Sequence, residues 1–460
     1  MTPSCPFETP LSLSERDRRA MHNLAQRCLN ETLLDYEHVL ASKSGLPSAT
    51  RWKPIKRKEN VVVYQDRLAI EEIKRQKRKT RSLGDLLDST RVGDLLNRSM
   101  GPAMHRASAA TYDPDASNES KELPKMIWMG TVECDLDDLM YGLVSQNDAV
   151  TRIKSSYSGN DIQDFATLAS LATATSSDPF YGLQLKWEVN SALTKAKPVW
   201  RCRDFVYLEA TGVTKSRATG QRIGYRILHS LDVRGVPELP GRKLTRGKVT
   251  IYQLFRQKSK GTVEVFAKAM VDLAGDVPAS VAAFATAEAA TSVNQAAKCA
   301  LKRKLNWLLS TSVTSENSSS TGNAVSCSVC SRDFKSHFAQ KSFFECIICT
   351  KLVCHRCRIS KRLSFLEPGS ASSSSVTVVK KTLDVCTRCV HTAAQTNARR
   401  VALEERMGDS AAMYKYMPRE KFPPFEEVPG PQEEIEVSGA SMREGVVLLE
   451  RETQLFHSIQ

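Results

Sequence analysis

The chain has 460 residues, of which 41% are hydrophobic and 25% are charged. These proportions are usual for globular proteins and exclude a fully disordered or fibrous chain, and the length predicts two or three folded units. The formal net charge of +14 favours partners that carry phosphate. No long apolar run occurs, and the N-terminal stretch contains Glu8, Glu15 and Asp17. A secreted or membrane-spanning protein is therefore disfavoured, and a cytoplasmic location is expected.

The N-terminal region combines a helical segment with one that resists folding. Residues 11–40 predict a helix, with Ser12 or Ser14 as its cap. Residues 66–124 contain the basic run KRQKRKTR and then a stretch rich in Ser, Asp and Asn, a composition that does not build a packed core. We expect a disordered insert there. A nuclear-import signal or a membrane-surface patch is the alternative interpretation of its basic run.

Residues 126–270 predict an antiparallel sheet. In 221–229 (QRIGYRILH) and 262–270 (TVEVFAKAM), apolar and polar side chains alternate, which is typical of strands with one buried face. Further strands are expected at 126–133, 182–189, 203–209 and 248–256. Together these segments suffice for one strongly curved sheet.

A long helix is expected after the sheet. Gly275-Asp276-Val277-Pro278 interrupts the strand pattern, and residues 279–309 then contain neither Gly nor Pro. The first half of the apolar face of this helix consists largely of alanine. Small side chains above a concave sheet leave space that Leu or Phe would fill. The pattern thus predicts an internal cavity, and an Ala-rich helix packed closely on its sheet is the alternative.

Three segments, RDFVYLE (203–209), GYRILHS (224–230) and DLAGDVP (272–278), together with the long helix after them, resemble a START lipid-binding domain over about residues 10–310. The resemblance implies a curved sheet that grips the C-terminal helix and encloses a tunnel for one lipid or sterol. It also suggests that Arg203 faces this cavity and pairs with Glu188, a surface salt bridge being the alternative. Aromatic residues expected on the tunnel wall, which core packing would use as well, are Trp187, Tyr207, Tyr225, Tyr252 and Phe266.

Eight of the 13 cysteines form four C-x-x-C pairs in residues 327–389. Without a secretory signal the compartment is expected to be reducing, where such pairs are metal ligands rather than disulfides. A two-residue spacer lets both thiolates of a pair face one tetrahedral zinc ion, and two pairs complete a closed site of structural type. The predicted ligands of two zinc ions are Cys327, Cys330, Cys346, Cys349, Cys354, Cys357, Cys386 and Cys389.

The spacing C-x2-C-x15-C-x2-C-x4-C-x2-C-x28-C-x2-C resembles a FYVE-type finger over about residues 327–390. A RING or PHD finger would use a histidine ligand and a different spacing. The resemblance implies interleaved sites. One zinc ion would be held by Cys327, Cys330, Cys354 and Cys357, and the other by Cys346, Cys349, Cys386 and Cys389.

The finger departs from FYVE domains that bind phosphatidylinositol 3-phosphate. Those domains carry a basic R-R/K-H-H-C-R-x-C-G stretch and an R-V-C, whereas this chain has KSFFECIICT at 341–350 and Asp384 in place of the arginine. A carboxylate there repels phosphate, so weak phosphoinositide specificity is expected. Weaker docking on a membrane is expected from nearby cations, for which plain solvated charge is the alternative. These cations are Lys351, Arg356, Arg358, Lys361 and Arg362.

The predicted fold class is therefore α+β, in four parts. A START-like helix-grip domain spans 1–310, a Ser-rich linker 311–326, a small two-zinc cross-brace finger 327–390 and a mostly disordered acidic tail 391–460, in which 392–407 continues as a short helix. The finger contains a flexible SASSSS loop at 370–375.

The resemblances imply a non-enzymatic lipid-binding or lipid-transfer protein, with a lipid or sterol as ligand and a finger that docks on a peripheral membrane surface, endosomal or other. A regulatory scaffold whose finger binds a small GTPase or another protein is the alternative. Nucleic-acid binding is disfavoured, because aromatic residues do not interleave with the basic runs. An enzyme is disfavoured because no phosphate-binding glycine loop, H-E-x-x-H or G-x-S-x-G motif occurs.

Overall fold

The computed structural model describes residues 5–41, 47–67, 125–158, 162–191, 200–275, 277–314, 326–333, 343–368, 376–408 and 410–416. The expected disordered insert at 66–124 lies outside these residues apart from its first two. The SASSSS loop and the part of the expected disordered tail (391–460) from residue 417 onward lie outside them as well, whereas most of residues 391–416 are helical.

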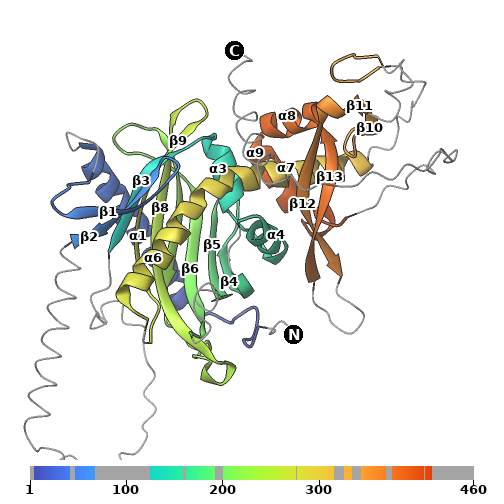
Figure 1. Cartoon of the computed structure of the whole chain (residues 1–460). Helices are drawn as coiled ribbons and strands as arrows, with labels where there is room; N and C mark the ends of the chain where they lie inside the picture. Colours follow the sequence, from blue (N-terminus) through green and yellow to red (C-terminus); the bar gives the residue numbers. More distant parts are fainter. Residues whose placement is uncertain are drawn as a thin grey trace, which may run out of the picture. The chain divides into compact units, whose positions relative to one another are not determined.

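A large antiparallel sheet forms the N-terminal part (Figure 1). It has nine strands in the order β1-β2-β3-β9-β8-β7-β6-β5-β4, and β6 also makes a short parallel pairing with β8. The strands are β1 (Trp52–Lys58), β2 (Val61–Asp66), β3 (Met126–Val132), β4 (Ile162–Ala172), β5 (Gly182–Asn190), β6 (Cys202–Lys215), β7 (Arg222–Ser230), β8 (Leu244–Ser259) and β9 (Thr262–Asp272). All six predicted strands are confirmed.

Three further strands were not predicted, for local reasons. The register of β4 against β5 shifts at three points, so its side chains do not alternate regularly along the sequence. The edge strand β1 contains a proline and four basic side chains (WKPIKRK), which is typical of an edge that other chains cannot extend.

Helices cover both faces of the sheet. On the α1 face, helix α1 (Glu15–Ala41) contributes Cys28 and Tyr36 to a core with Tyr225 and Phe266 of the sheet. On the opposite face, here called the α7 face, lie α6 (Ala279–Ala290) and α7 (Asn294–Thr314), which a short turn (Thr291–Val293) connects (Figure 1). The side chain of Ser14 accepts a hydrogen bond from the Asp17 amide at 3.1 Å, which confirms Ser14 as the cap of α1.

The expected single helix at 279–309 is therefore two helices, the second of which ends at Thr314. Residues 311–314 of the expected linker thus belong to α7. Two shorter helices, α3 (Leu136–Leu143) and α4 (Asp148–Ser158), follow β3 and lie against α7.

The cysteine-rich region contains two small antiparallel pairs of strands. Strand β10 (Phe343–Glu345) pairs with β11 (Leu352–Cys354), and β12 (Arg358–Pro368) pairs with β13 (Val376–Cys386). Helices α8 (Thr387–Gln395), α9 (Ala398–Met407) and α10 (Ser410–Met413) follow. The short helix expected at 392–407 is interrupted, because the side chain of Asn397 accepts hydrogen bonds from the Arg399 and Arg400 amides and starts α9 anew.

Helix α7 belongs to two cores at once. Its residues Ala296 and Ala300 pack with the sheet, whereas Leu305 and Leu309 pack with the paired cysteines. Between them, the fully buried Arg303 places Nη2 at 2.6 Å from Glu405 Oε2 in α9. The sheet and the cysteine-rich region are therefore joined by a helix that is buried in both.

Glu405→Gln is expected to lower the free energy of unfolding by about 3 kcal/mol, because it leaves the buried Arg303 without its counter-charge. Urea unfolding followed by tryptophan fluorescence measures the change. Glu404→Gln is the matched control: Glu404 accepts from Trp307 and Arg400 at a partly exposed position, where an amide still accepts, so a loss below about 1 kcal/mol is expected. Equal losses in the two variants would contradict the prediction.

Candidate ligand site and metal centres

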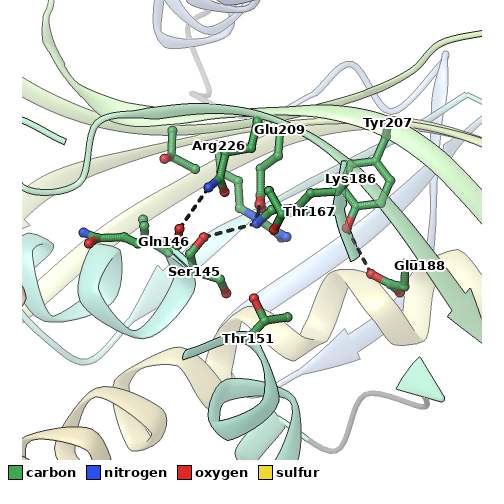
Figure 2. A network of polar contacts seen from close by, with 12 residues as sticks. Ser145, Gln146, Thr151, Thr167, Lys186, Glu188, Tyr207, Glu209 and Arg226 are labelled. Carbon is green, nitrogen blue, oxygen red and sulfur yellow. Dashed lines mark hydrogen bonds and ion pairs between the residues drawn. The ribbon is translucent and has the colours of Figure 1, made fainter. Parts of the chain in front are cut away.

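Charged side chains from three neighbouring strands meet on the α7 face (Figure 2). They are Lys186 in β5, Glu209 in β6 and Arg226 in β7. Lys186 Nζ lies 2.5 Å from Glu209 Oε2, and Arg226 Nε lies 2.7 Å from Glu209 Oε1. Burial alone would raise the pKa of Glu209, but these two cations hold it well below its usual value. The single carboxylate of Glu209 thus forms ion pairs with two cations.

The backbone of the segment between α3 and α4 accepts hydrogen bonds from polar side chains of the sheet. Lys186 Nζ donates to the Ser145 carbonyl at 3.1 Å (Figure 2). Gln184 Nε2 donates to the Gln146 carbonyl at 2.9 Å. Lys154 of α4 donates to the Leu143 carbonyl at 2.8 Å. Burial, together with the nearby charge of Arg226, lowers the pKa of Lys154 to about 7.

A second carboxylate, that of Glu188 in β5, lies beside this group. It accepts a hydrogen bond from Tyr207 at 3.0 Å (Figure 2), and burial raises its pKa. We call Lys154, Lys186, Glu188, Glu209 and Arg226 together the charged cluster.

Two buried polar atoms beside the charged cluster have no hydrogen-bond partner within the described part of the chain. They are Ser145 Oγ and Gln253 Oε1. Gln253 lies directly opposite Arg226 across β8 and β7, and the carbonyl of Ser145 accepts from Lys186. Buried polar atoms almost always have a partner, so these two indicate a place for a bound molecule or for water.

An apolar patch adjoins the charged cluster on the same face. Leu228 and Val249 of the sheet pack there with Ala282 of α6, and Ile251 and Ala285 lie against them. The side chain of Ile251, on the central strand β8, stays partly exposed beneath α6, and that of Arg226 on β7 is 21% exposed. Packing on this part of the α7 face is therefore incomplete.

The predicted cavity residues divide between the two faces. Tyr207 lies on the α7 face, in the apolar patch. Trp187, which contacts Phe7 with ring centroids 5.6 Å apart, belongs to a core on the opposite face, and Tyr225 packs with α1 there. Trp187 and Tyr225 therefore lie on the face opposite that of Tyr207, because successive side chains of a strand point to opposite faces. Tyr252 and Phe266 also pack with α1.

Arg203 does not pair with Glu188. Its guanidinium donates to the carbonyls of Leu273 at 2.7 Å, Arg201 at 2.5 Å and Ala274 at 3.2 Å. In the register of β5 and β6, Arg203 is opposite Asn190 and not Glu188. Arg203 therefore fixes the end of β9 before the turn into α6, and the expected pairing is wrong.

The paired cysteines form two groups of four. One contains Cys327, Cys330, Cys354 and Cys357, and the other Cys346, Cys349, Cys386 and Cys389. Within each group the sulfur atoms all lie within 4.8 Å of one another. This is the interleaved arrangement that the sequence predicted.

The distances between the sulfur atoms suit a tetrahedral metal ion. Sγ of Cys330 lies 3.7 Å from that of Cys354, and Sγ of Cys349 lies 3.8 Å from that of Cys386. A tetrahedron with metal–sulfur bonds of about 2.3 Å, the value for zinc, has edges of about 3.8 Å. Backbone amides also point at the thiols, as that of Cys386 does at Cys346 Sγ (3.2 Å), which is the usual surrounding of a thiolate ligand.

Asp384 neutralises one of the expected docking cations. Its Oδ2 lies 2.9 Å from Arg358 Nη2, and its Oδ1 accepts a hydrogen bond from Ser360 at 2.6 Å. The carboxylate of Asp384 in β13 is thus held by two side chains of β12, Arg358 and Ser360.

No family model and no curated protein matches the chain. Among solved structures, human StAR-related lipid transfer protein 5 is 12% identical with a TM-score of 0.36, covering 61% of this chain and 98% of its own. Human STARD10 is 12% identical with a TM-score of 0.33, covering 58% and 79%. A STAR-related lipid transfer protein fragment from Xanthomonas axonopodis is 14% identical with a TM-score of 0.31, covering 54% and 96%. At these TM-scores, none of the likenesses supports a statement about ligands.

Among the described helices, none is long and apolar enough to cross a membrane.

Two zinc ions per chain are expected in the purified protein, and Cys386→Ser is expected to reduce the content to one. The same variant should lower the melting temperature by several degrees, because the cysteine groups share a core with Leu305 and Leu309 of α7. Elemental analysis and thermal unfolding measure the two effects. Cys5→Ser, outside both groups, should change neither, and a metal content unaffected by Cys386→Ser would contradict the assignment.

Lys154 is expected to make the fold more stable as the pH rises. Its pKa is about 7 in the fold against a usual value of 10.5, so between these values the unfolded chain binds more protons and stability increases with pH. The free energy of unfolding should therefore rise more between about pH 7 and 9 in the wild type than in Lys154→Met.

Urea unfolding at several pH values measures the difference. Lys248→Met is the control, since Lys248 pairs with Asp232 on the exposed surface, and this variant should keep the wild-type slope. A slope in Lys154→Met equal to that of the wild type would show that Lys154 keeps its ordinary pKa.

Proposed function

We propose that this protein binds a lipid or sterol without chemical conversion and transfers it between membranes, with the ligand held on the α7 face of the sheet. The observation that carries the proposal is the pairing of unpartnered buried polar atoms with incompletely packed apolar side chains on one covered face. A polar group beside an apolar patch suits an amphipathic molecule. Removal of apolar ligand surface from water contributes about 25 cal/mol per Å².

The composition of the covering helix supports this proposal. Ala282, Ala283 and Ala287 of α6 are buried toward the sheet, and their short side chains leave more room than Leu or Phe would. The site also offers charged and polar groups that hold and orient a ligand. A binding protein fits these features better than an enzyme does.

The cysteine-rich region is proposed to be a FYVE-related zinc finger that holds two zinc ions and docks the protein on a membrane surface. The sulfur geometry supports zinc. The pairing of Arg358 with Asp384 supports weak phosphoinositide specificity, because that cation already has an anion. Lys351, Arg356 and Arg362 remain as contributors to weaker binding of anionic lipid.

A regulatory scaffold is the second candidate function. One observation favours it: the half of the α7 face nearest α3 is filled, with Trp128, Leu139 and Phe255 almost completely buried. If the apolar patch were filled in solution as well, the finger would remain as a surface for a small GTPase or another protein.

Ala285→Phe is expected to reduce bound lipid, because Ala285 lies against the apolar patch and a phenyl ring would occupy the ligand volume. Ala289→Phe is the matched control, since Ala289 lies on the exposed side of the same helix. Native mass spectrometry and lipid extraction of the full chain, followed by exchange against a panel of lipids and sterols, measure the occupancy. A wild-type protein that retains and exchanges none of them would contradict the proposal and favour the scaffold.

A further inference from the structure

The charged cluster has more positive than negative groups. Lys154, Lys186 and Arg226 are cations, whereas Glu188 and Glu209 are the carboxylates among the five. With all five ionised, one positive charge is in excess. Removing a charge from water is costly unless an opposite charge compensates for it, so a fold that keeps this excess under helices favours an incoming anion.

Some hydrogen-bond donors of the charged cluster have no acceptor among the described residues. Arg226 donates from Nε to Glu209, and its two terminal nitrogens have no hydrogen-bond partner within the described ranges. Lys154 donates only to a carbonyl there. A guanidinium with two free terminal nitrogens is suited to a carboxylate or phosphate, which it can bind in a bidentate manner.

Other charged residues near the cluster have partners of their own. Asp148 at the start of α4 accepts from Thr167 at 3.0 Å, and the guanidinium of Arg152 lies 4.9 Å from the ring centroid of Phe165. Asp148, the carboxylate of the two, therefore does not balance the excess positive charge of the charged cluster through this contact. Burial of its ammonium, together with the nearby charge of Arg226, lowers the pKa of Lys154.

We propose that the ligand carries an anionic head group, a carboxylate or a phosphate, which Arg226 and Lys154 bind while its apolar chain lies on the patch formed by Leu228, Val249 and Ala282. Leu228 is two residues from Arg226 on β7 and therefore on the same face, so the head and the chain of one molecule reach both parts. Gln253 and Ser145 offer further polar contacts beside the head group. This inference rests on the proposed lipid-binding function and narrows its ligand class.

The test compares three probes with the same chain and different heads, namely oleate, oleyl phosphate and oleyl alcohol. Each is titrated below its critical micelle concentration into the delipidated full chain, and binding is measured by native mass spectrometry. At least one of the two anions is expected to bind about tenfold or more tightly than the alcohol, as hydrogen bonds between charged groups allow. The stronger of the two anions identifies a carboxylate or a phosphate head.

Variants then locate the site. Lys154→Met and Arg226→Gln are each expected to reduce the ratio of the anion's affinity to that of oleyl alcohol about tenfold. Lys248→Met, an exposed lysine on the neighbouring strand paired with Asp232, should keep the preference. Lys154→Met removes one backbone hydrogen bond and no ion pair among the described contacts, so it tests the site even if Arg226→Gln fails to fold.

The outcomes separate the two proposals. Equal binding of the alcohol and both anions, or a preference that survives in Lys154→Met and Arg226→Gln, would overturn the anionic head group and leave lipid binding intact. No binding of any probe would overturn the anionic head group and count against lipid binding as well.

Discussion

The carboxylate of Glu209 makes the charged part of the α7 face possible. It is buried between Lys186 and Arg226, with an oxygen within hydrogen-bond distance of each, and without it two cations would lie under helices with no compensation. Its position on β6, between the strands that carry the two cations, is fixed by the register of the sheet. The charged cluster, the unpartnered polar atom of Gln253 and the apolar patch all lie on the α7 face of the sheet.

Helix α7 packs on the same face of the sheet and connects it to the cysteine-rich region. Its alanines lie on the sheet, and its leucines lie in the core that contains the metal-binding groups. The Arg303–Glu405 pair fixes α9 against the same helix. The sheet and the cysteine-rich region are thus joined by packed side chains of one helix.

Much of the fold follows from local sequence pattern. Alternation along GYRILHS and TVEVFAKAM predicts strands, and the C-x-x-C spacings predict two four-cysteine groups, because both depend on residues close together in the chain. Less of the candidate site can be predicted from local sequence pattern. Lys186 and Glu188 alternate with Leu185 and Trp187, a pattern that ordinarily indicates a solvent-exposed face. Local pattern therefore favours the aromatic side chain of Trp187 as a cavity residue, whereas Trp187 lies on the opposite side of the sheet.

The sequence by itself determined six of the nine strands of the large sheet, the alanine-rich helical segment and the two four-cysteine groups, since propensity, periodicity and cysteine spacing are properties of short segments. The tertiary structure alone decided which face of the sheet the helices α6 and α7 cover. It thereby placed ordinary polar residues of β5, β6 and β7 in a buried charged cluster. It also placed Arg203 where its guanidinium donates hydrogen bonds to backbone carbonyls. The physical reason is that the burial of these strands depends on helices elsewhere in the sequence, such as α6 and α7, and no local pattern records which polar face will lose its water.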